Sequence, residues 1–315
     1  MSDSELRELM EELRGRLVSR LLGLGFDVPS VDRSDVSRAL EACLRILHRT
    51  VPRRPRSVHW SNDLRAKHLP EATLNGILAV EMEIRNGDDL NHRLTRRYFD
   101  SGFDDRLLND LGVTHFHLGR PGEGSDRTGR RTMSGGSAAL LWAVVEPDDA
   151  YFIDVSGHSG FDELDFVDVI CRNWKHLLSE PLHGWSDLEP KLSPNERARL
   201  RRVGISTLVD YDGEIFLAGQ FTKSGLSWEV GRAADAILNE IVRLYRALSA
   251  RTELVLDKIA ELTGSRPSRI RFRAGEVSEL IAGKVTLADE GSGVRFCQVG
   301  DQVQCHRSGA PVPAE

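Results

Sequence analysis

Paired cysteines and long apolar runs are missing from this sequence of 315 residues. Its four cysteines are scattered, with no CxxC pair, so they suit buried thiols better than a zinc ribbon or a redox motif. The longest apolar run, Ala138 to Val145, is far too short to cross a bilayer, and the opening residues MSDSELRELM carry acids where a secretion signal carries lysine and arginine. We therefore expect a cytoplasmic protein with no membrane partner.

The signatures of several enzyme classes are also missing. There is no P-loop and no GxGxxG turn after a predicted strand, which argues against nucleotide-fuelled and dinucleotide chemistry. No GxSxG elbow supports a serine hydrolase, and no HExxH pair supports a zinc site on a helix. We expect no cofactor.

The composition is that of a folded globular protein. Hydrophobic residues make up 40% and charged residues 29%, which argues against long disorder, and the length is about twice that of a common domain. The net charge of −6 gives no overall attraction to nucleic acid, yet VPRRPR at 51–56 and GRRT at 129–132 are locally basic. The total charge gives a nucleic-acid role no support, while the local patches leave it open.

Helices are predicted on both sides of a strand-rich centre. Apolar residues at helical spacing indicate helices over 4–24, 34–50 and 74–86, and a long helical run over 228–263. Alternation of apolar and polar residues predicts strands in the centre, and turn residues such as Asp212-Gly213 predict hairpins after it.

The central strands are expected over 113–119, 138–146 and 150–157. Pro147-Asp148-Asp149 joins the last two as a hairpin, and an amphipathic helix over 162–178 follows. Near the C-terminus, FCQVGDQVQC predicts one more hairpin.

Together these elements predict an α+β fold in three regions. The N-terminal helical region covers 1–55 and ends at the proline-containing basic stretch. A central α+β domain with a small antiparallel sheet and a helix covers 56–185. A C-terminal α+β domain with a helical run and short β-hairpins covers 186–315.

Histidines in the central region are the main candidates for chemistry. In VTHFHLG the alternation directs His115 and His117 to one strand face, and His158 follows a neighbouring strand. Imidazoles in such a pattern bind a transition metal, or transfer protons near neutral pH, or form an inert hydrogen-bonded surface. The HxH pair by itself leaves all three readings open.

The arginines beside these histidines favour proton transfer on RNA. Cleaving RNA without metal requires a base for the 2′-hydroxyl, an acid for the leaving 5′-oxygen and cations for the phosphoryl charge. The histidines can supply the first two. Arginines suit phosphate because their planar fork donates two hydrogen bonds at once, and the candidates are Arg120, Arg130 and Arg131. A solvated loop is the plain alternative for these arginines.

A metal-dependent hydrolase would instead need carboxylates that converge with the histidines. Asp154 lies on the strand before His158, and Asp105 and Asp110 precede the HxH strand. No recognised metal-ligand spacing accompanies them, so the sequence favours this reading less.

Three segments resemble a family of uncharacterised prokaryotic proteins: GDDLNHRLTRRYFD, DDRLLNDLGVTHFHLG and AYFIDVSGHSGFDELDFVDVICRNW. The family pattern is roughly G-x-D-L-x-x-x-L-S, then D-x-L-L-N-D-W-G-I-H-H-x-H-L-G, then Y-x-I-x-V-x-x-H and finally N-W. The resemblance covers residues 87–174, with Leu111 in place of the usual tryptophan and Thr114 in place of a further histidine. It implies a shared site without naming a reaction.

The hairpin AALLWAVVEPDDAYFIDVSGH is similar to the core of RelE-like ribonuclease toxins. This resemblance implies that the hairpin forms the last strands of a small antiparallel sheet, and that RNA is cleaved without metal by basic side chains and sometimes a histidine. It implies an acid-base role for His158. Lysine is scarce here, which departs from that family's basic site.

The sequence therefore leads to a metal-independent ribonuclease of the toxin or antiviral-defence type, with RNA and a protein inhibitor or assembly partner as candidate partners. The expected catalytic residues are His115, His117 and His158, and the expected substrate-binding residues are Arg120, Arg130 and Arg131. The alternatives are a non-catalytic binding or regulatory module of a defence or toxin-antitoxin system, and a histidine-metal hydrolase.

Overall fold

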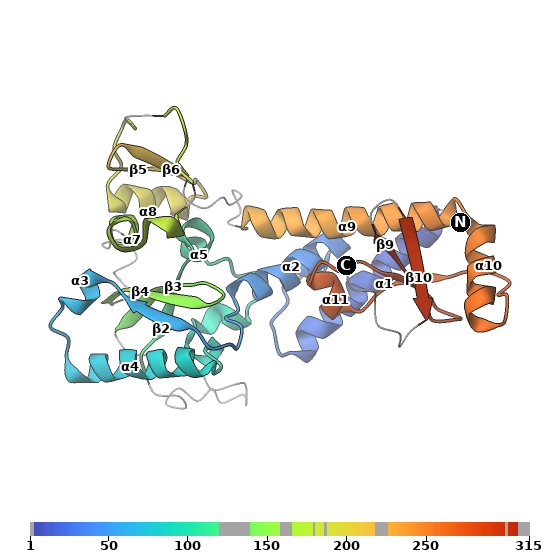
Figure 1. Cartoon of the computed structure of the whole chain (residues 1–315), viewed down its shortest axis with the longest axis horizontal. Coiled ribbons are helices and arrows are strands. Elements are labelled where there is room, and N and C mark those ends of the chain that lie inside the picture. Colours follow the sequence, from blue (N-terminus) through green and yellow to red (C-terminus); the bar gives the residue numbers. More distant parts are fainter. Residues whose placement is uncertain are drawn as a thin grey trace. The chain divides into compact units, whose positions relative to one another are not determined.

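The computed structural model describes the chain in seven stretches: 3–119, 139–157, 166–178, 180–185, 188–217, 226–299 and 302–307. The chain divides into two compact units (Figure 1). The larger unit comprises Leu47–Phe99 and Phe103–Trp228, and the smaller comprises Met1–Ile46, Asp100–Gly102 and Glu229–Glu315. Both contain helices and mainly antiparallel sheets, so the α+β prediction is confirmed.

The larger unit is built on a four-stranded sheet of order β1-β4-β3-β2. Its strands are β1 (Ser57–Trp60), β2 (Val113–His117), β3 (Leu140–Val145) and β4 (Asp149–Ser156). The predicted strands form β2, β3 and β4, which pair antiparallel. The sequence pattern did not predict β1, which pairs parallel with β4 at the edge of the sheet. A strand of four residues after a proline-containing stretch is too short to show alternation.

Helices cover both faces of this sheet, with α4 (Glu71–Asn86) and α7 (Phe166–Trp174) on opposite sides (Figure 1). On the α7 face, Trp142 and Phe166 belong to one buried cluster. On the α4 face, a β-carbon at Gly76 would lie 2.9 Å from Leu118, so the missing side chain lets α4 approach the end of β2.

Shorter elements complete the larger unit. They are α3 (Asn62–Arg65), η2 (Asn91–Arg93), η3 (Arg96–Phe99), α5 (Arg106–Leu111), η4 (Lys175–Leu177), α8 (Pro194–Arg202), β5 (Leu208–Tyr211) and β6 (Glu214–Leu217). The hairpin of β5 and β6 turns where predicted, with φ of 56° at Asp212 and 79° at Gly213. Positive φ at both central residues is typical of a two-residue hairpin turn.

The smaller unit combines the two ends of the chain. It contains α1 (Asp3–Gly23), η1 (Val31–Arg33), most of α2 (Val36–Arg49), all of α9 (Trp228–Ser249) but its first residue, α10 (Thr252–Thr263) and α11 (Val277–Ile281). Its antiparallel sheet has the order β10-β9-β8-β7, from β7 (Phe272–Ala274), β8 (Leu287–Asp289), β9 (Val294–Val299) and β10 (Gln302–Arg307). The predicted run over 228–263 forms α9 and α10. Arg16 of α1 donates hydrogen bonds to the carbonyls of Ala274 and Gly275.

The partition into 1–55, 56–185 and 186–315 stays a prediction, and the boundaries of the two compact units lie elsewhere. Contacts between α1 and β7 join segments more than 250 residues apart, which leave no local pattern in the sequence. Within the described stretches, no helix is both long and apolar enough to cross a membrane.

Candidate functional site

His115 and His117 lie on one face of β2, as the alternation predicts. Their ring centroids are 5.7 Å apart and their planes make an angle of 63°. His115 is 7% exposed and its ring packs 5.2 Å from that of Trp142 on β3. His117 is half-buried, so it is the more accessible imidazole of the pair.

His117 stands in a row with Leu140 and Ser156 across the sheet. Leu140 on β3 pairs with His117 on one side and with Ser156 on the other. Neighbouring strands lie about 4.8 Å apart, so the backbones of His117 and Ser156 are separated by about 10 Å. The end of β2, the start of β3 and the end of β4 therefore lie together at one end of the sheet.

The other predicted site residues are Arg120, Arg130, Arg131 and His158, and all lie outside the described residues. The chain leaves the described sheet after Gly119, returns at Ala139 and leaves again after Gly157. The first two of these points adjoin β2 and β3, and the third adjoins β4. All belong to the end of the sheet that carries His117.

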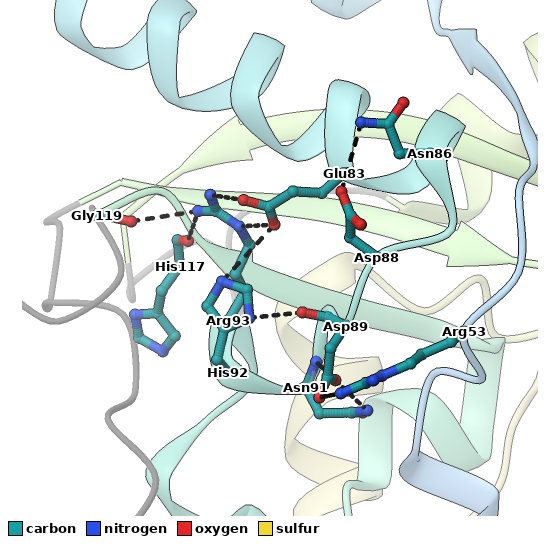
Figure 2. A network of polar contacts seen from close by, with 10 residues as sticks. All are labelled: Arg53, Glu83, Asn86, Asp88, Asp89, Asn91, His92, Arg93, His117 and Gly119. Atoms are coloured by element: carbon teal, nitrogen blue, oxygen red, sulfur yellow. Dashed lines mark hydrogen bonds and ion pairs between the residues drawn. The ribbon is translucent and has the colours of Figure 1, made fainter.

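Arg93 holds the end of β2 in place (Figure 2). Its side chain is 2% exposed, and its Nε and Nη2 donate to the two carboxylate oxygens of Glu83 on α4, each at 2.6 Å. Its Nη1 donates to the carbonyls of His117 at 3.1 Å and Gly119 at 3.2 Å. In Figure 2 the His117 ring points away from the guanidinium, so Arg93 fixes the backbone and leaves the imidazole to other contacts.

Two residues earlier on η2, Asn91 holds a different segment. Its side-chain oxygen accepts from the Val51 amide at 3.0 Å, and its nitrogen donates to the Val51 carbonyl at 3.2 Å. The carboxylate of Asp89 accepts from Arg53 at 2.6 Å and from Asn91. Burial alone would raise the pKa of Asp89, but these hydrogen bonds lower it below its usual value.

The sequence did not reveal the role of Arg93. An arginine in the polar run GDDLNHRL reads as solvated surface, because charged side chains are seldom fully buried. The carboxylate of Glu83, ten residues earlier, and the carbonyls of His117 and Gly119 make its burial tolerable. Two charged residues ten positions apart follow neither the helical nor the strand period, so the sequence pattern does not reveal that they pair.

The carboxylates considered for a metal site are engaged elsewhere. Asp154 lies 2.6 Å from the Lys67 ammonium, and Asp110 accepts from Arg201 at 2.6 Å. Asp105 is the N-cap of α5, where its side chain accepts from the amides of Leu107 and Leu108. Among the described residues, no three His, Cys, Asp or Glu side chains are grouped so that they could hold a metal ion.

A second imidazole cluster, absent from the sequence prediction, lies on β1 and β4. His59 Nε2 is 2.7 Å from Asp149 Oδ1, and the His59 ring stacks on Tyr151 with centroids 5.0 Å apart. The Tyr151 hydroxyl is 3.4 Å from His176 Nε2. Burial, with help from nearby carboxylates, raises the pKa of Tyr151. Because β1 was missed, nothing in the sequence brought His59 and Tyr151 together.

The described motif residues of the first resemblance belong to the larger unit, apart from Asp100. The segment of Gly87 to Leu94 contacts the end of the HxH strand through Arg93, and Asn173 of the N-W pair bonds to the Asn62 amide and to Asp63. Both resemblances remain predictions. No protein-family model, curated protein or solved structure matches the chain.

Proposed function

We propose that this chain is a metal-independent ribonuclease of the toxin or antiviral-defence type, acting on RNA in the cytoplasm. The observation that supports this most is the row of His117, Leu140 and Ser156. The segment with the three arginines and the segment with His158 both begin at that end of the sheet. The last described residues before these two segments, Gly119 and Gly157, follow β2 and β4 at that same end of the sheet.

In this proposal His117 and His158 share the proton transfers. His117 is the more accessible of the two histidines on β2, which suits a group that must reach substrate. His115, packed against Trp142, supports the ring of His117. Arg120, Arg130 and Arg131 would stabilise the charge that develops on the phosphoryl oxygens.

The position of the hairpin also supports the proposal. The segment that resembles the core of RelE-like toxins forms β3 and β4, the last two strands of the sheet along the chain. Arg93 adds preorganisation, because a buried bidentate ion pair fixes the backbone on which His117 sits.

The test is cleavage of end-labelled RNA by purified protein in the presence of EDTA. We expect wild type to cleave, and His117→Ala and His158→Ala to lose activity by about 100-fold or more. His68→Ala is the matched control, because His68 is an exposed histidine of the same unit outside the site, and it should cleave as wild type does.

Other outcomes would assign the chain to the alternatives. Cleavage that needs an added divalent ion would replace the proposal with a histidine-metal hydrolase. Failure to cleave any RNA, with or without metal, would refute it and leave a binding or regulatory module with a protein partner. An inhibitor or assembly partner, proposed only from the sequence, would then be sought by affinity capture.

A further inference from the structure

The larger unit contains a pocket of about 340 Å³ at the other end of the sheet from His117. Its walls come from the end of α2 and the basic segment after it, the start of β2, and the turn between β3 and β4. Side chains of Arg49, Arg54 and Arg56 line it, together with His48 and Thr50. Pockets for small organic ligands have volumes of about 300–1,000 Å³, so this one has room for more than a bare ion.

Arg56 is the unusual member of this lining. It is 6% exposed, and its guanidinium donates only to backbone carbonyls: Nε to Glu146 at 2.8 Å, and Nη1 to Pro52 at 3.1 Å and Arg54 at 3.0 Å. Among the described residues it forms an ion pair with no carboxylate. Burial lowers the pKa of Arg56, the neighbouring charge of Arg54 adds to this, and the Asp148 carboxylate partly offsets it. A buried cation that is bonded to no carboxylate is stabilised when an anion binds beside it.

Arginines outnumber acidic residues in the described lining of the pocket. Arg49 donates to the carbonyls of Phe103 at 2.6 Å and Tyr98 at 2.7 Å. Arg54, at the rim, is bonded to the carboxylate of Asp148. Among the described residues that line the pocket there are three arginines and one acidic residue, Glu146, and the Arg49 guanidinium is directed to the carbonyls of Phe103 and Tyr98. A phosphate monoester, which carries a charge of about −1.5 to −2 at neutral pH, suits this balance better than a singly charged diester.

The pocket is also rigidly built. The Arg56 amide donates to the Ile84 carbonyl at the end of α4 at 3.2 Å, and Asn91 bonds to both backbone groups of Val51. Gly87 has φ of 77°, and a β-carbon there would lie 2.7 Å from the Pro55 nitrogen. A segment held this closely is already ordered before a ligand arrives, which lowers the entropy lost on binding.

We propose that this pocket binds the phosphomonoester group of a small organic molecule, with Arg56 and Arg54 as its principal anion ligands. Leu47, Val51 and Val145 give the pocket an apolar wall for the organic part of the ligand. A nucleoside monophosphate and the 5′-phosphate end of RNA share this chemistry. The site is separate from the proposed catalytic end of the sheet, because neither His115 nor His117 lines it.

The proposal is tested by titrating the full chain with AMP and with inorganic phosphate at constant ionic strength, with calorimetry and the shift of the thermal unfolding midpoint as readouts. Wild type should bind AMP and unfold at a higher temperature in its presence. Arg54→Gln and Arg56→Met should weaken binding at least about tenfold, the loss expected for one charge-assisted hydrogen bond. His117→Ala should bind as wild type does.

Arg53→Gln is the matched control. Arg53 belongs to the same basic segment, but it is exposed, bonded to Asp89 and absent from the pocket lining, so its loss should change affinity by less than about twofold. If Arg56→Met does not fold, Arg54→Gln at the exposed rim still decides the matter. Equal weakening by the control, or wild type that binds neither AMP nor phosphate, would overturn the proposal.

The source of the phosphate is settled by a second pair of probes, a short RNA with a 5′-phosphate and the same RNA with a 5′-hydroxyl. Preference for the phosphorylated RNA that Arg54→Gln abolishes would identify an RNA end as the ligand. Binding of AMP without that preference would identify a mononucleotide. If both RNAs bind equally and AMP displaces neither of them, the pocket is not a phosphomonoester site.

Discussion

Arg93→Ala should destabilise the larger unit more than removal of an ordinary surface charge. The substitution leaves the Glu83 carboxylate and the carbonyls of His117 and Gly119 without their shared donor. Breaking one side of a buried ion pair costs about 3–5 kcal/mol. Since the Glu83 side chain is 20% exposed and water can partly replace the arginine, we expect about 3 kcal/mol.

Urea unfolding followed by tryptophan fluorescence measures this loss. All five tryptophans belong to the larger unit, so the signal reports on the unit that contains Arg93. Arg85→Ala provides the comparison on the same helix as Glu83. Arg85 is 52% exposed and pairs with Glu81, so its loss should cost at most about 1 kcal/mol.

A double-mutant cycle separates the pair from its surroundings. Arg93→Met combined with Glu83→Gln should cost less than the sum of the single changes, by more than about 1 kcal/mol, because the second change removes a charge that the first left unpaired. If Arg93→Ala costs no more than Arg85→Ala, or if the two single changes simply add, then Arg93 does not hold the end of β2 through its ion pair with Glu83.

Three other properties can be measured on the same protein. Asp89→Asn should destabilise the larger unit less at pH 3 than at pH 7. The pKa of Asp89 is lowered in the folded state, so its contribution is fully present above the unfolded value near 3.8 and is lost as the pH falls through the folded value. Gly87→Ala should cost clearly more than Gly112→Ala in urea unfolding; both have positive φ, but only at Gly87 would a β-carbon meet backbone atoms. In native alkylation followed by mass spectrometry, Cys305 should react before Cys43, which is buried and whose pKa burial raises to about 12. Equal urea midpoints for the two glycine variants, an unchanged effect of Asp89→Asn across pH, or early labelling of Cys43 would each contradict its prediction.

Elements with a strong local pattern were predictable from the sequence. The alternation in VTHFHLG predicted β2 and the common face of His115 and His117, and Asp212-Gly213 predicted a hairpin turn. These features depend on residues two to four positions apart, which is the range over which periodicity and turn preferences act.

Features that depend on distant partners were not predictable. His115 is buried because it packs against Trp142, its partner on the neighbouring strand β3. Arg93 is buried because it pairs with Glu83 on α4. The basic segment 51–56 read as a boundary between regions, yet Arg56 is enclosed by carbonyls, one of which comes from the turn at Glu146. A charged residue in a sequence is expected to be exposed to solvent, and only the structure shows a tertiary partner that lets it be buried.

Two residues of the short helix η2 hold two separate parts of the larger unit. Asn91 holds the wall of the pocket, and Arg93, two residues later, holds the strand end that carries His117. A substitution that tilts or unwinds this single turn would disturb both places together. A single substitution in η2 should therefore be pleiotropic: it should impair the pocket at one end of the sheet and the position of His117 at the other.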